Sequence, residues 1–65
     1  KSNSGKMHYA LADAYCISGD KKKCLDHLEK SINLDPFFAV LAQNERDFEE
    51  LGRDEDFQKL VNTNE

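Results

Sequence analysis

The side chains in this chain that could do chemistry are two cysteines, two histidines and a run of carboxylates. Cys24 and His27 stand three residues apart, a spacing that places both on one face of a helix and could offer two ligands to a metal ion. A structural zinc site needs four ligands, and only His8 and Cys16 remain, eight residues apart from each other. The sequence therefore predicts no metal site and no cofactor.

The two cysteines leave two chemical alternatives. Cys16 and Cys24 flank a predicted turn, so a disulfide between them is one interpretation, although it requires Cα atoms within about 7 Å. Two reduced thiols in a cytosolic chain are the favoured interpretation. Nucleophilic catalysis by either thiol with His27 would need a thiolate, a base within reach and a pocket, and two helices with a short cap predict no such cleft.

The charged residues do not point to catalysis either. Carboxylates are dense between Glu45 and Asp56, and on short helices we interpret them as a solvated face rather than as an acid-base pair. Lys21, Lys22 and Lys23 could bind an anion at a helix start, but surface solubility is the favoured interpretation. We predict no catalytic residues and a chain that is not an enzyme.

Length and composition restrict the class of protein. Sixty-five residues make one domain at most, with 38% apolar and 34% charged residues and a net charge of -4. No apolar run approaches the ~20 residues of a membrane span, and no basic face offers itself to nucleic acid. The polar start, KSNSGK, does not resemble a signal peptide, and a chain that begins with Lys1 is expected to be a fragment. We expect a cytoplasmic protein with neither membrane nor nucleic acid as a partner.

Apolar spacing predicts an all-α fold built on a helical hairpin over residues 5–36. Three-and-four spacing of apolar and small residues predicts helices over 5–17 and 21–34, after a polar tail at 1–4. Gly19 can end the first helix in the left-handed conformation, and Asp20 can cap the second. Since the connection is so short, the two helices must run antiparallel. Pro36 ends the second helix and starts the next.

Three short helices are predicted after the hairpin, over 36–43, 45–51 and 54–61, with a frayed tail at 62–65. Phe48 and Leu51, then Phe57 and Leu60, each place two large apolar side chains on one side of a single turn. Helices this short do not persist alone, since ~12–15 residues are needed for marginal stability in water. Residues 37–61 are therefore expected to dock on the hairpin as a cap.

The hairpin resembles one repeat of the tetratricopeptide (TPR) family. The residues that carry this resemblance are Leu11, Ala12, Tyr15, Gly19, Asp20, Cys24 in place of the usual alanine, Leu28, Ser31 and Pro36. The segment FEELGRDEDFQKL, residues 48–60, is similar to the F-x-x-L-x-x-D-P-x-F-x-x-L segment that closes many bacterial TPR arrays. Two residues depart from the pattern: His8 replaces a tryptophan or other large residue, and Glu55 replaces a proline.

The resemblance implies a terminal TPR module that acts as a protein-protein interaction scaffold. In TPR arrays the first helix of a repeat lines a concave groove that binds a partner's peptide or helix. The matching residues here are Lys6, Tyr9, Asp13, Cys16 and Ile17. Asp13 would favour a basic or hydroxyl-bearing partner. Weak self-association is expected through the side of the first helix turned away from the second, which includes Met7 and Leu11.

Two other functions remain open from the sequence. The chain could be a purely structural end cap of a TPR array without a ligand of its own. It could also be a regulatory domain attached to an enzyme that lies outside this fragment.

Overall fold

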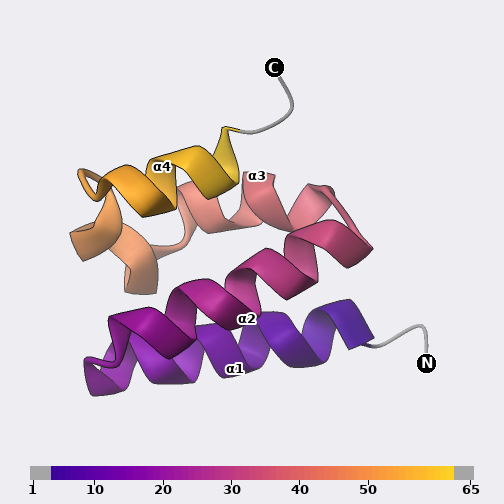
Figure 1. Cartoon of the computed structure of the whole chain (residues 1–65), viewed down its shortest axis with the longest axis horizontal. Coiled ribbons are helices and arrows are strands. Elements are labelled where there is room, and N and C mark those ends of the chain that lie inside the picture. The colour runs from indigo at the N-terminus through magenta and orange to yellow at the C-terminus, as the bar shows by residue number, and fades with distance from the viewer. Residues whose placement is uncertain (1–3, 63–65) are drawn as a thin grey trace.

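Two long antiparallel helices form the larger half of the protein. The computed structural model describes residues 4–62, and within them lie five helices and no strand. Helix α1 (Ser4–Ser18) packs along α2 (Lys21–Leu34), as Figure 1 shows. The all-α class and the hairpin are confirmed, and α2 has the predicted bounds. Ser4 already lies within α1, one residue earlier than predicted, and the rest of the expected tail falls outside the described residues.

The turn between α1 and α2 follows from two residues. Gly19 has φ +90°, a conformation that costs glycine little because it has no Cβ. Asp20 then caps α2, because its carboxylate accepts a hydrogen bond from the Lys23 backbone N–H at 3.1 Å. Asp20 N–H also donates to the Tyr15 carbonyl at 2.9 Å, which satisfies one orphan group at the end of α1. The turn that reverses the chain direction is therefore determined by Gly19 and Asp20 themselves.

The second half consists of α3 (Phe37–Asn44), a 3₁₀ helix η1 (Arg46–Leu51) and α4 (Glu55–Val61). The helix predicted over 36–43 begins one residue later, because Pro36 caps it rather than joining it. The helix predicted over 45–51 is a 3₁₀ turn, a form that suits short connectors of this length. Asp54 caps α4 as expected, accepting from the Phe57 backbone N–H at 3.0 Å. The expected fraying beyond residue 62 lies outside the described part.

The hairpin contributes small or medium side chains to the core, and the C-terminal half contributes large ones. Ala12, Cys24 and Leu28 are fully buried where α1 and α2 cross. Phe48 and Phe57 are also buried and bring η1 and α4 into the same core. Their ring centroids are 5.9 Å apart. Buried residues of the hairpin and of the C-terminal half form a single apolar cluster.

Aromatic contacts join α1 to the cap. The Tyr9 ring stacks on Phe38 with centroids 5.2 Å apart and meets Phe48 edge-on at 5.7 Å. Gly5 allows this close approach, since a Cβ there would lie 2.7 Å from Phe38 Cε2. Phe38 is thus the phenylalanine that packs against the hairpin, whereas Phe37 is 58% exposed.

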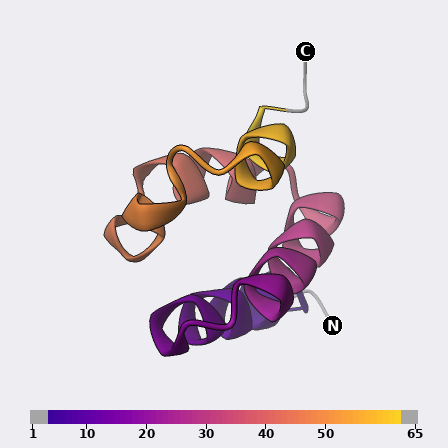
Figure 2. The same cartoon turned by 60° about the vertical axis from the view of Figure 1, so that its left-hand side comes forward.

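The chain follows an open curve in Figure 2, with the α1–α2 hairpin along one arm and α3, η1 and α4 along the other. Helix α2 contacts α3 and α4, while η1 reaches back to contact α1. Among residues 4–62, no helix has both the length and the apolar character needed to cross a membrane.

Candidate functional site

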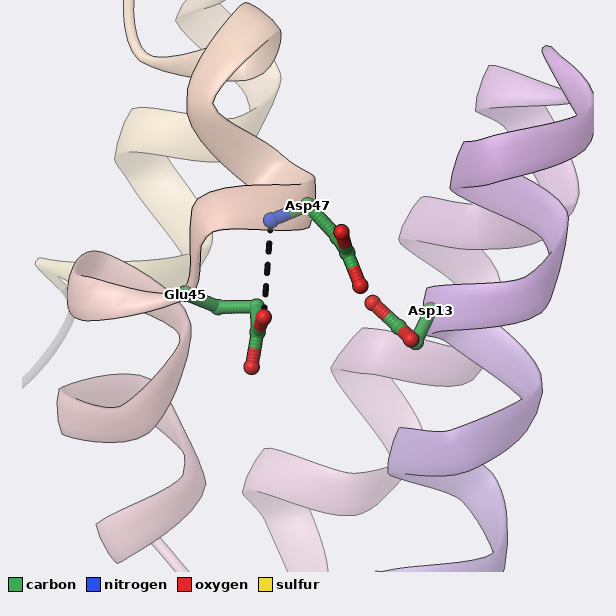
Figure 3. Close-up of side chains that lie close together, drawn as sticks. All are labelled: Asp13, Glu45 and Asp47. Atoms are coloured by element: carbon green, nitrogen blue, oxygen red, sulfur yellow. Dashed lines mark hydrogen bonds between the residues drawn. The ribbon is translucent and has the colours of Figure 1, made fainter.

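Three carboxylates converge where η1 approaches α1. Asp13 on α1, Glu45 before η1 and Asp47 in η1 each place one oxygen within 4.8 Å of the others. In Figure 3 the carboxyl groups of Asp13 and Asp47 point toward each other, with Glu45 beside them. We call these three residues the acidic cluster. Asp47 is exposed and the other two are half-buried, so the cluster opens to solvent on one side.

Local structure explains how two of these carboxylates reach the third. Glu45 is the cap of η1, and its carboxylate accepts from the Asp47 backbone N–H at 3.4 Å. Asp47 immediately precedes Phe48, whose burial holds η1 against α1. The Cys16 thiol donates to the Asp47 carbonyl at 3.0 Å, which adds a direct link between the two helices. Packing of one phenylalanine therefore brings two acids to Asp13.

The crowded negative charge changes the acidity of Asp13. Burial, then the hydrogen bond and the charge of Asp47, then the charge of Glu45 raise the pKa of Asp13 to about 6. Asp13 Oδ1 is buried and has no donor among the described residues. A hydrogen bond between Asp13 and Asp47 requires that one carboxyl carry a proton, since two carboxylates only accept. The cluster therefore takes up a proton or another positive charge more readily than isolated acids do.

Tyr9 borders the acidic cluster one helical turn before Asp13. Its hydroxyl oxygen is buried and has no hydrogen-bond partner in residues 4–62. Burial, and then the charges of Glu45, Asp13 and Asp47, raise the pKa of the Tyr9 phenol above its ordinary range. Tyr9 therefore stays protonated, and the interaction of its O–H with the nearby Glu45 carboxylate also raises the phenol pKa.

The acidic cluster has no cation of its own in the described part of the chain. The ion pairs found there are Lys21 with Asp54 and Lys30 with Asp26, both outside the cluster. Carboxylate oxygens suit a lysine or arginine side chain, and they also suit hard divalent cations. The arrangement is therefore suited to binding positive charge, and it includes no nucleophile with a depressed pKa.

The predicted groove residues divide into two groups. Tyr9, Asp13 and Cys16 all contact the cap at the α1–η1 junction. Lys6 and Ile17 are exposed on α1, with Ile17 67% exposed. Three of the five predicted residues are thus brought together, and the chain's own η1 covers part of their face.

Sequence reasoning missed the two acids that complete the cluster. Glu45 and Asp47 were expected on a solvated face. Because acidic residues are so frequent between Glu45 and Asp56, the sequence does not indicate which of them contact α1. The sequence did contain one indication of this position. Asp47 is the neighbour of Phe48, so it must lie near the surface of α1 on which Phe48 packs. The two cysteines are free thiols, as favoured, and burial raises the pKa of Cys24 to about 12.

Apart from the acidic cluster, a hollow with a volume of about 630 Å³ lies among α3, η1 and α4. Its carboxamides are committed to internal bonds: Gln43 donates to the Val61 carbonyl at 2.7 Å, Asn62 donates to Gln58, and Gln58 donates to the Gly52 carbonyl. These donors are therefore satisfied within the chain.

Another hollow, of about 1010 Å³, is lined by Lys21, Lys22, Lys23 and by further residues of α2 and α4 that include carboxylates. Its lining carries both signs of charge, whereas the acidic cluster carries only negative charge, so the acidic cluster is the candidate site for a cation. Comparisons of this chain with protein-family models, with curated proteins and with solved structures find no match.

Proposed function

We propose that this chain is a protein-interaction module that holds a lysine or arginine side chain of a partner at the acidic cluster. The observation that carries the proposal is the convergence of three carboxylates that form no ion pair with any lysine or arginine of residues 4–62. A partner's ammonium or guanidinium group would offset the repulsion that raises the pKa of Asp13. The Tyr9 ring packs on Phe38 and Phe48 beside the acidic cluster and joins α1 to the cap at this point.

The sequence resemblance to a terminal TPR repeat supports the same role. That resemblance implies a peptide or helix as the ligand, bound along the first helix of the hairpin. Asp13 and Tyr9 belong both to the predicted groove and to the contact at η1. The proposal assigns no catalytic step to the chain, and two free thiols fit a reducing, cytoplasmic compartment.

A structural end cap is the second candidate function. It is favoured by the way η1 covers Tyr9, Asp13 and Cys16 with the chain's own backbone. In that case the junction would only close the molecule, and no partner would contact the acidic cluster.

A binding titration separates these two functions. A fluorescently labelled lysine-rich peptide is the probe, and the same peptide with acetylated lysines is the control for charge. We expect the double variant Asp13→Asn/Asp47→Asn to lose about tenfold or more in affinity, since a hydrogen bond to a charged group contributes about 1.5–3 kcal/mol.

The matched control is Glu29→Gln/Glu55→Gln, which removes the same charge at exposed positions outside the cluster. Equal loss in both double variants would show that only net charge attracts the peptide. Binding that neither variant changes would favour the end cap.

A further inference from the structure

The only two histidines of the chain meet across the hairpin. His8 lies on α1 and His27 on α2, and their Nδ1 atoms are 3.0 Å apart. The ring planes differ by 22°, with centroids 5.2 Å apart, and both side chains are half-buried. The sequence spacing suggested Cys24 as the neighbour of His27, whereas the folded hairpin pairs His27 with His8.

Two imidazole nitrogens at this separation have the spacing of neighbouring ligands on one metal ion. With metal-to-nitrogen distances of about 2.0–2.1 Å, two nitrogens on one ion lie about 3 Å apart or slightly more, so a small ring movement converts this contact into a pair of ligands. We propose that His8 and His27 form a two-imidazole site for a divalent transition-metal ion that imidazole suits, Cu²⁺ or Ni²⁺.

The surroundings hold His27 in place for such a role. The Tyr15 ring stacks on His27 with planes 11° apart and centroids 5.5 Å apart. The partial exposure of both imidazoles leaves room for water as the remaining ligands.

Metal binding requires a change of tautomer and a small ring movement. In a hydrogen bond between two neutral imidazoles, one Nδ1 carries a proton and donates, and the other Nδ1 accepts the hydrogen bond through its lone pair. That proton moves through solvent to Nε2 of the same ring, which frees the second lone pair without net proton release. Rotation of the rings about their Cβ–Cγ bonds then turns both lone pairs toward one ion.

Donor type separates this site from the acidic cluster. Imidazole nitrogens suit Cu²⁺, Ni²⁺ and Zn²⁺, whereas carboxylate oxygens suit Ca²⁺ and Mg²⁺. Because His8 and His27 come from different helices, a bound ion cross-links α1 to α2. Binding to the folded chain should therefore raise its melting temperature.

The test is a Ni²⁺ titration of the whole chain, followed by thermal melts. We expect the melting temperature to rise with Ni²⁺. The variants His8→Asn and His27→Asn should each weaken the apparent affinity at least about tenfold, since the fold holds the second imidazole next to the first and its binding is intramolecular. Asp56→Asn, at an exposed acid outside both sites, is the control and should bind Ni²⁺ like the unchanged chain. An unaltered response in either histidine variant would overturn the proposal.

A spectroscopic readout on the unchanged chain does not depend on how the variants fold. Electron paramagnetic resonance of the Cu²⁺ complex should show two equatorial imidazole nitrogens. A spectrum with one imidazole nitrogen, or with none, would contradict the two-histidine site.

Discussion

At the residue scale, Asp13 combines a cost to stability with a capacity to bind. Its carboxylate is partly desolvated and faces Asp47 and Glu45, so the folded chain holds a proton there more tightly than the unfolded chain does. A cation from a partner would relieve the same repulsion. The strain and the proposed function therefore have one physical origin.

Stability should fall as pH rises from about 4 to about 6. The pKa of Asp13 is about 6 in the folded chain against an ordinary value of 3.8, so the stabilising effect of its proton is complete below the lower value and lost above the higher one. Asp13→Asn should flatten this slope. It should also stabilise the chain at pH 7 by about 1 kcal/mol, a figure reduced for solvent screening.

Urea melts across this pH range measure the effect. Glu29→Gln, an exposed substitution outside the cluster, should leave the slope unchanged. If Asp13→Asn destabilised the chain at pH 7, the repulsion described for the cluster would be absent.

At the scale of elements, helix boundaries follow from local sequence, whereas the acidic cluster depends on contacts between elements. Asp20 and Asp54 cap their helices through their own side chains, and Gly19 takes the conformation that its lack of a Cβ permits. These features depend only on neighbours in sequence, which is why the boundaries of α2 and α4 were predicted within one residue.

The acidic cluster could be predicted only in part, because it depends on contacts between residues that are far apart in sequence. Asp13 and Tyr9 follow from the helical period of α1 and from the resemblance. Glu45 and Asp47 reach them because Phe48 docks between the halves, a contact between segments more than thirty residues apart in sequence. The 3₁₀ form of η1 likewise depends on that docking, since an isolated six-residue helix has little stability of its own.

Phe57 should be the most sensitive position in α4. It is 3% exposed and packs against Phe48, so Phe57→Ala leaves a cavity and should cost about 3–5 kcal/mol. A loss of this size is enough to unfold a small domain. Thermal melts should show it, with exposed Lys59→Ala as the control within the same helix. An unchanged melting temperature would mean that α4 is not docked in solution.

Glu55 tests the start of α4. It is the first residue of the helix, and Asp54 before it has φ -75° and ψ 128°, a conformation that a following proline tolerates. Glu55→Pro loses a helix-dipole interaction of about 0.3–1 kcal/mol and gains about 0.4–1 kcal/mol by restricting the unfolded chain. The variant should be nearly neutral in dilute buffer and mildly stabilising in high salt.

Denaturant melts of Glu55→Pro and of the unchanged chain at two salt concentrations measure these differences in stability. A loss above about 2 kcal/mol would place Glu55 inside the helix, where proline removes a backbone hydrogen bond.

At the scale of the whole molecule, the C-terminal helices cover one side of the hairpin, and the other side is exposed to solvent. Met7 is 54% exposed and Leu11 is 37% exposed on the side of α1 turned away from α2, which agrees with the expectation that this side is incompletely covered. We predict weak, concentration-dependent self-association through these residues.

Sedimentation at increasing concentration measures that association. Met7→Gln/Leu11→Gln should abolish it, whereas Leu34→Gln, at another exposed apolar residue, should not. A chain that stays monomeric at high concentration would contradict the prediction.

The measurement that tests the proposed function most directly is a nuclear magnetic resonance titration with the lysine-rich peptide. Shift changes should centre on Asp13, Glu45 and Asp47, extend to Tyr9, and weaken as salt is added. The peptide with acetylated lysines should produce none of them. Changes spread over the other exposed acids, such as Glu50 and Asp56, or no change at the acidic cluster, would contradict the account.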